Sequence, residues 1–188
     1  HISFVVFMTL IVVGFFSVMQ VDPHHDGIML KPAVDVANGK MLFRDTFCQY
    51  GGLTTLVQAL VIKLFGERLI VIRILTAFLY GLISILLWLI FSRVLPKRLA
   101  TFSCITWLLL GYFFIDYPAM IIFPWSTVFA VFSILLSLYL VILSLENKNR
   151  QLLFLVGAIS ALTLYFKLNY GIISFLSLFF LLLFLNIF

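Results

Sequence analysis

Charged residues are scarce in this chain. Asp, Glu, Lys and Arg make up 10% of its 188 residues, whereas soluble domains contain about 25%. Hydrophobic residues reach 64%, and the mean hydropathy is +1.25. This composition excludes a soluble globular domain and predicts an integral membrane protein.

Cysteine is nearly absent, and basic runs with interleaved aromatic residues are lacking. Cys48 lies in a polar segment and Cys104 in an apolar one, on opposite sides of the membrane in the predicted topology, so no disulfide is expected. The formal net charge is +5, and five of the twelve basic residues lie in two short loops. The sequence therefore indicates no nucleic-acid partner.

Long apolar blocks, by contrast, are abundant. A transmembrane helix needs about 20 mostly apolar residues. We therefore expect an all-α polytopic membrane protein. It has about six transmembrane helices, at 2–19, 69–92, 99–115, 120–145, 152–166 and 170–188.

The first apolar block predicts an uncleaved span rather than a signal peptide. It lacks a basic n-region, and Asp22-Pro23-His24 offers no small-residue cleavage site. The chain starts at His1 and stops inside an apolar run at Phe188. We expect one transmembrane domain, 1–188, that is a fragment of a longer protein truncated at both ends.

Short basic loops predict the orientation. Arg93, Lys97 and Arg98 separate the second and third spans, and Lys148 and Arg150 separate the fourth and fifth. The positive-inside rule makes both loops cytoplasmic. Alternation then leaves three segments on the extracytoplasmic side, at 21–68, 116–119 and 167–169.

The segment 21–68 is the first extracytoplasmic loop in this topology, and it is rich in polar residues. We expect a short helix at about 31–38, with Pro32 in its first turn and Gly39 at its C-terminal cap. A second helix is expected at about 53–64, where a leucine stripe favours a position in the interface plane. A shallow re-entrant segment is the alternative for this second helix.

Two aspartates of this loop are candidate catalytic residues. Asp26 is the candidate general base, because partial desolvation at a membrane interface makes a carboxylate more basic towards a hydroxyl group. Asp22 lies four residues earlier and could share or orient that role. Helix capping, or solvation of the loop, is the alternative role for either residue.

His24 and His25 stand beside these aspartates and suggest a metal site, because imidazole and carboxylate are suitable ligands. Adjacent histidines rarely point at one ion, and no second ligand cluster follows. A divalent metal is therefore possible but not favoured, and no metal ligand is assigned.

Lys167 and Arg73 are cations at the edges of predicted spans. Such charges are functional candidates, and a lipid phosphate would be a suitable partner for either one. The alternative is that both side chains extend to the headgroup region without a specific partner.

Several short motifs occur in order along the chain. They are Asp26-Gly27, Gly39-Lys40-Met41-Leu42-Phe43-Arg44-Asp45-Thr46-Phe47, Tyr50-Gly51-Gly52, Leu64-Phe65-Gly66, Arg73 and Lys167-Leu168-Asn169-Tyr170-Gly171. This order resembles the membrane glycosyltransferases of the GT-C superfamily, of the family 39-like, dolichyl-phosphate-mannose and aminoarabinose transferase type.

The resemblance implies transfer of a sugar from a polyprenyl-phosphate donor to an acceptor hydroxyl on the extracytoplasmic face of the cell membrane. It implies that Asp26 is the base, with Asp22 in reserve, and that a lipid, glycan or protein is the acceptor. The implied phosphate ligands are Lys167, Arg44 and Arg73, and the other loop candidates are His24, His25, Asp45 and Tyr50. No glycine-rich phosphate loop is present for a nucleotide sugar.

A non-enzymatic polytopic membrane protein, such as a flippase for lipid-linked sugars or an assembly subunit, is the alternative. A transport pathway would favour ionisable residues in the middle of spans. Here the charges of the predicted spans lie near their ends, which favours the enzyme.

Overall fold

The computed structural model describes residues 1–19, 21–113 and 124–184, and these residues form eight α-helices and no β-sheet. The all-α class predicted from the sequence is confirmed. The helices are α1 (Ile2–Met19), α2 (Pro23–Ala37), α3 (Gly52–Phe65), α4 (Leu69–Val94), α5 (Lys97–Phe113), α6 (Ser126–Asn147), α7 (Gln151–Phe166) and α8 (Leu168–Phe184).

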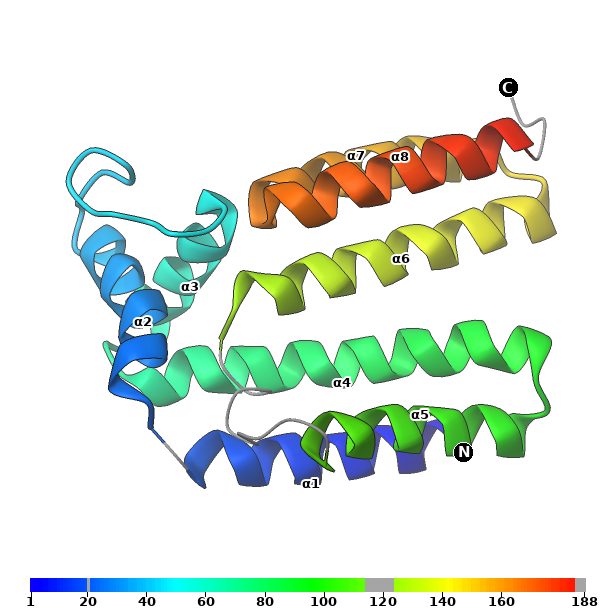
Figure 1. Ribbon diagram of the computed structural model, residues 1–188, viewed down its shortest axis with the longest axis horizontal. Coiled ribbons are helices and arrows are strands. Elements are labelled where there is room, and N and C mark those ends of the chain that lie inside the picture. The colour runs from blue at the N-terminus through cyan, green and yellow to red at the C-terminus, as the bar shows by residue number, and fades with distance from the viewer. Residues whose placement is uncertain (20, 114–123, 185–188) are drawn as a thin grey trace.

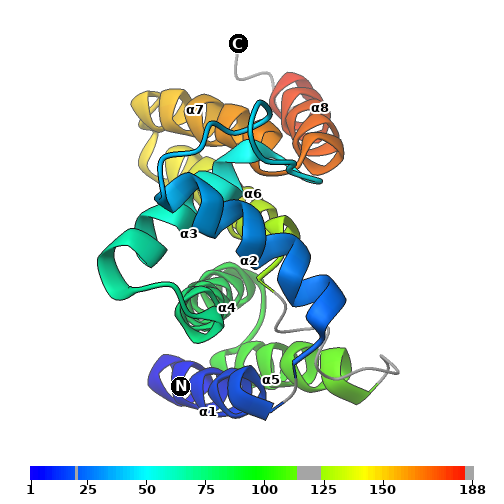
Figure 2. The same cartoon turned by 90° about the vertical axis from the view of Figure 1, so that its left-hand side faces the viewer.

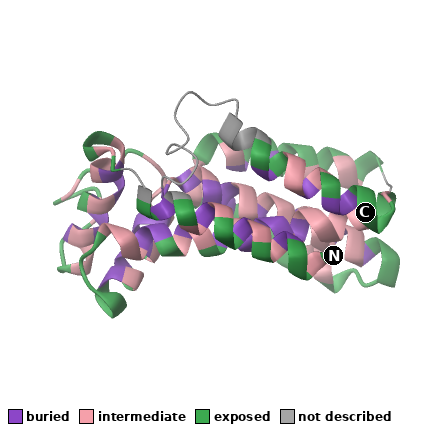
Figure 3. Cartoon of the chain, turned by 90° about the horizontal axis from the view of Figure 1, so that it is seen from below, coloured by how far each residue is buried: buried purple, intermediate pink, exposed green. Residues whose placement is uncertain are grey.

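Six of these helices run side by side, and the two short ones, α2 and α3, lie across one end of the bundle (Figures 1 and 2). In the described part of the chain, α4 and α6 are long and apolar enough to cross a bilayer, and α7 and α8 are shorter apolar helices. Large apolar side chains such as Phe78, Phe154 and Phe180 are exposed on the outside of the bundle. Figure 3 shows this outward exposure along the long helices. The pattern suits a surface in contact with lipid.

Small residues lie between the helices of the second half of the chain. Ser133 and Ser137 of α6, Ser160 of α7 and Ser174 of α8 are buried. A Cβ atom on Gly171 would stand 2.5 Å from Cα of Leu164, so the backbones of α7 and α8 approach closely there. Small residues at helix contacts are typical of membrane bundles.

The polar segments that connect the long helices lie at two opposite ends of the bundle. The turns that join α4 to α5 and α6 to α7 lie at one end, and α2, α3 and the start of α8 lie at the other (Figure 1). The basic residues of the two short loops therefore share one end, as the sequence predicts. Which end faces the cytoplasm stays a prediction.

The first short helix is longer than predicted. It begins at Pro23 rather than near 31, so Pro32 lies inside α2 and Pro23 takes the position in the first turn. The cause is Asp22, whose side chain accepts hydrogen bonds from the backbone N–H groups of His24 and His25 and so caps the helix. The helix predicted at 53–64 corresponds closely to α3.

The fourth predicted span, 120–145, also differs. Pro124 and Trp125 are not helical, and α6 begins at Ser126. Proline has no N–H group to continue a helical ladder, which favours a helix start after it. Residues 114–123, with Asp116, lie outside the described residues, as do the last residues of the sixth predicted span, 185–188.

The α3 helix turns its polar face towards the bundle. Thr54, Thr55 and Gln58 are buried, whereas Leu56 and Leu60 are exposed. The Gln58 side-chain amide donates a hydrogen bond of 2.7 Å to the carbonyl of Pro124. The leucine stripe therefore faces outward, which is the orientation expected of a helix that contacts lipid.

Candidate functional site

The first candidate group is formed by Asp22 and His25 at the start of α2. Oδ1 of Asp22 accepts hydrogen bonds from the backbone N–H groups of His24, at 2.9 Å, and His25, at 3.0 Å. Oδ2 lies 2.9 Å from Nδ1 of the His25 ring. The hydrogen bond from the His25 side chain, with those from the backbone, lowers the pKa of Asp22 below its usual range. The carboxylate is therefore held charged and in a fixed orientation beside the imidazole.

Asp26 lies one turn further along α2, in a buried ion pair. Its Oδ2 is 2.6 Å from Nη2 of Arg73, and the two side chains are each 4% exposed. Arg73 also donates through Nη1 to the carbonyl of Ser17, at 2.8 Å. The backbone N–H of Asp22 donates to Oδ2 of Asp26 at 3.0 Å. This junction connects the end of α1, the start of α2 and the start of α4.

The two aspartates therefore differ in access. The Asp22 side chain is 37% exposed and that of His25 is 28% exposed, whereas Asp26 is closed off by Arg73. The geometry disfavours the predicted roles of Asp26 as the base and of Arg73 as a phosphate ligand, because each already neutralises the other. A substrate could reach either side chain only if this pair opened.

Aromatic rings connect His25 to the other end of the site. The His25 ring stacks on Trp125 with centroids 5.8 Å apart, and Trp125 lies 5.7 Å from Tyr50. Sequence reasoning selected His25 and Tyr50 but missed Trp125. A tryptophan near the end of a span is common at any membrane interface, so its position carried no specific signal.

Lys167 lies between α7 and α8 beside these rings. Its Nζ is 5.4 Å from the centroid of the Tyr50 ring and 4.8 Å from that of Tyr170, and it donates a hydrogen bond to Oγ1 of Thr127. No carboxylate of a described residue forms a salt bridge with it. Burial lowers the pKa of its ammonium group. Lys167 is thus a partly desolvated cation that has no carboxylate partner among the described residues.

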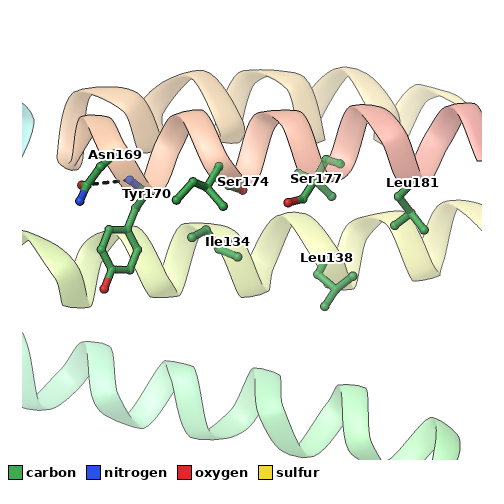
Figure 4. A pocket seen from close by; sticks show the side chains of 9 residues that line it. Ile134, Leu138, Asn169, Tyr170, Ser174, Ser177 and Leu181 are labelled. Carbon is green, nitrogen blue, oxygen red and sulfur yellow. Dashed lines mark hydrogen bonds between the residues drawn. The ribbon is translucent and has the colours of Figure 1, made fainter.

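An apolar groove of about 370 Å³ runs between α6 and α8 (Figure 4). Asn169 and Tyr170 line its polar end, where Tyr170 contacts Lys167. Its remaining lining is mostly aliphatic, with two serines: Ile134, Leu138, Ile173, Ser174, Ser177, Leu178 and Leu181. Sequence reasoning did not find this groove, because it depends on how far apart α6 and α8 pack.

Arg44 and Asp45 form a pair of their own on the exposed loop between α2 and α3. Nη2 of Arg44 is 2.9 Å from Oδ2 of Asp45. The loop is fastened by Asp35, whose carboxylate accepts hydrogen bonds from Lys31, Lys40 and Thr46. The structure therefore gives Arg44 and Asp45 a role within the loop, where they pair with each other.

The metal hypothesis for His24 and His25 gains no support from geometry. The two rings meet edge to face, with centroids 5.1 Å apart. Within residues 1–19, 21–113 and 124–184, no three side chains of His, Cys, Asp or Glu gather as metal ligands do. No metal ligand is assigned to either histidine.

A comparison with protein families gives one match. Residues 53–186 match the family model described as dolichyl-phosphate-mannose-protein mannosyltransferase. The match covers more than half of the chain, so the chain belongs to this family of membrane glycosyltransferases. It includes Trp125, Lys167 and the groove, and begins after Asp22, His25, Asp26 and Tyr50. No curated protein and no solved structure matched the chain significantly.

Proposed function

We propose that this member of the mannosyltransferase family transfers a sugar from a polyprenyl-phosphate donor to an acceptor hydroxyl group at the end of the bundle that carries α2 and α3. The observation that carries the proposal is the contact of Lys167 with Tyr170, which lines one end of the apolar groove between α6 and α8. A donor of this class has a phosphate next to a long apolar chain, and this end of the bundle offers a cation next to an apolar groove.

The cation contributes to the chemistry as well as to binding. When the sugar leaves, the polyprenyl phosphate gains negative charge on the oxygen that it keeps. An ammonium group in a partly desolvated position stabilises such charge more strongly than one in bulk water. Lys167 is proposed to bind the donor phosphate and to stabilise it as the leaving group.

Activation of the acceptor is proposed to depend on Asp22 rather than on Asp26. Asp22 is accessible beside His25, and Asp26 is committed to Arg73. Asp26 keeps a role in this proposal, because its pair with Arg73 holds the start of α2 against α1 and α4. Asp22 and His25 therefore keep a fixed position relative to the bundle.

The proposed side of the reaction is extracytoplasmic. The turns that join α4 to α5 and α6 to α7 lie at the end opposite to α2 and α3, and they include or adjoin Arg93, Lys97 and Lys148. Basic residues at such short turns favour a cytoplasmic location for this end, whereas Lys31, Lys40 and Arg44 at the other end are paired with Asp35 and Asp45. Reporter fusions after Gly39 and after Lys97 are expected to report opposite sides of the cell membrane. A cytoplasmic location of Gly39 would contradict the proposed side.

The experiment that tests the function uses the purified full-length protein in vesicles. The vesicles contain polyprenyl-phosphate mannose, glucose, N-acetylglucosamine or 4-aminoarabinose, and an extract of cell envelope supplies acceptors. Release of polyprenyl phosphate from at least one donor is expected, with a rate that falls in the Lys167→Ala variant. If no donor is consumed, or if the protein only moves donors across the bilayer, the proposed function is wrong.

A further inference from the structure

We infer that His25, oriented by Asp22, takes the proton from the acceptor hydroxyl group, so that the base of this site is an imidazole. The inference rests on the proposed function and specifies its acid–base step. The contact that carries it is the 2.9 Å approach of Asp22 Oδ2 to His25 Nδ1. A carboxylate in this position fixes both the ring orientation and the tautomer of a catalytic histidine.

The hydrogen bonds of Asp22 make the carboxylate a better orienting group than a base. Oδ1 already accepts two backbone N–H groups, and Oδ2 faces the His25 ring. These contacts favour the charged carboxylate, which therefore has little tendency to keep a proton taken from a hydroxyl group. With the proton of the ring on Nδ1 and donated to Asp22, Nε2 carries the lone pair that accepts the next proton.

The surroundings of His25 connect its ring to the proposed site. The ring stacks on Trp125, and the two side chains share the lining of a small cavity with Tyr50. Tyr50 in turn contacts Lys167. The proton acceptor and the phosphate-binding cation are thus connected by two aromatic rings.

The step balances as a displacement at the anomeric carbon. The acceptor oxygen forms a bond to that carbon, and its proton moves to Nε2 of His25. The bond between the anomeric carbon and the phosphate oxygen breaks, and the electron pair leaves with the polyprenyl phosphate beside Lys167. The imidazolium that results is stabilised by the Asp22 carboxylate and later releases its proton to water.

Other ionisable groups near His25 enter the pH dependence. On α2 they are Asp22, the His24 ring at 5.1 Å and Asp26, whose charge is balanced by Arg73 of α4. From the loop before α3, the Tyr50 phenol shares the cavity lining. Imidazoles in general titrate near pH 6.5 and carboxylates near pH 4. The pH below which the reaction rate falls therefore differs between an imidazole base and a carboxylate base.

The test measures donor turnover and donor affinity for the wild type and for His25→Ala and His25→Gln, in the vesicle assay described above. Loss of a general base is expected to lower kcat on the order of 100-fold or more, with donor affinity within about threefold of wild type. Added imidazole is expected to restore part of the turnover of His25→Ala, because a free base can occupy the vacated position. His24→Ala, measured alongside, is expected to gain nothing from imidazole.

Each outcome decides between the two proposals. If the wild type consumes a donor and His25→Ala keeps its kcat within threefold, the inference is overturned and the proposed function stands. A low kcat that imidazole does not restore, with a wild-type acid limb near pH 4, would also overturn the inference and would assign the proton to a carboxylate. If the wild type consumes no donor, the proposed function itself fails.

Discussion

The Asp26 carboxylate and the Arg73 guanidinium form a buried ion pair, with Oδ2 2.6 Å from Nη2 and both side chains 4% exposed. The pair joins α2 to α4 across 47 residues of sequence, and Arg73 extends the junction to α1 through the carbonyl of Ser17. Two charges that the sequence suggested for catalysis and for phosphate binding thus neutralise each other inside the protein. Asp22 and His25, by contrast, are partly exposed.

The first prediction concerns this junction. Asp26→Asn leaves the Arg73 charge buried without its counter-ion and is expected to lower the free energy of unfolding by about 3–5 kcal/mol. The measurement is thermal unfolding of the purified protein in detergent. The Asp26→Leu/Arg73→Met double variant, which removes both charges, is expected to recover most of the loss. Asp45→Asn breaks an exposed ion pair and serves as the control with little expected change. Wild-type stability of Asp26→Asn would contradict a structural role.

The second prediction concerns pH and Lys167. Burial lowers the pKa of its ammonium group, so the charge is lost at a lower pH than in an exposed lysine. Donor affinity, measured as a Kd in vesicles, is therefore expected to weaken as the pH rises through this lowered pKa. Lys167→Arg is expected to bind the donor without this alkaline loss, because a guanidinium stays protonated to about pH 12. Equal alkaline limbs in both proteins would show that Lys167 does not hold the phosphate.

The third prediction concerns the groove between α6 and α8. Ser177→Trp fills part of its lining and is expected to raise the KM for a long polyprenyl donor by about tenfold or more, since each buried CH₂ group contributes about 0.8 kcal/mol. A donor analogue with a single isoprene unit does not reach Ser177 and should keep its KM. Phe180→Trp, at an exposed position of the same helix, is the matched control. An equal effect of both variants would argue against the groove.

The fourth prediction concerns two glycines with opposite surroundings. A Cβ atom on Gly51 would stand 2.0 Å from the carbonyl oxygen of Tyr165, so Gly51→Ala is expected to displace the loop from α7 and to destabilise the protein. Gly27 lies inside α2, with nothing within 4 Å of the added atom. Gly27→Ala is expected to stabilise the protein by up to about 1 kcal/mol through helix propensity. Unfolding midpoints that shift in the same direction would contradict this packing.

The sequence predicted the class and much of the architecture, because long apolar blocks and a leucine stripe are local patterns. The helix predicted at 53–64 corresponds closely to α3 for this reason. The sequence placed the start of α2 near 31, because Pro32 suits a first turn. In the structure Pro32 lies inside α2, and the Asp22 side chain caps the helix before Pro23.

The structure brings three of the candidate residues together. His25, Tyr50 and Lys167 were selected individually, and the structure connects them through Trp125. The difference between Asp22 and Asp26 could not be read from the sequence. It depends on which carboxylate lies against Arg73 of α4, and that is decided by the packing of α4 on α1 and α2, which lie far from it along the chain.

The most direct test of the central claim is the dependence of donor turnover on Lys167. The full-length protein and its Lys167→Ala variant are compared in vesicles that contain the four polyprenyl-phosphate sugars and envelope extract, and released polyprenyl phosphate is counted. The account predicts that the wild type consumes at least one donor and that kcat/KM falls on the order of 10- to 100-fold in Lys167→Ala, as expected for loss of a charge-assisted hydrogen bond. Equal turnover by the two proteins, or none by the wild type, would contradict it.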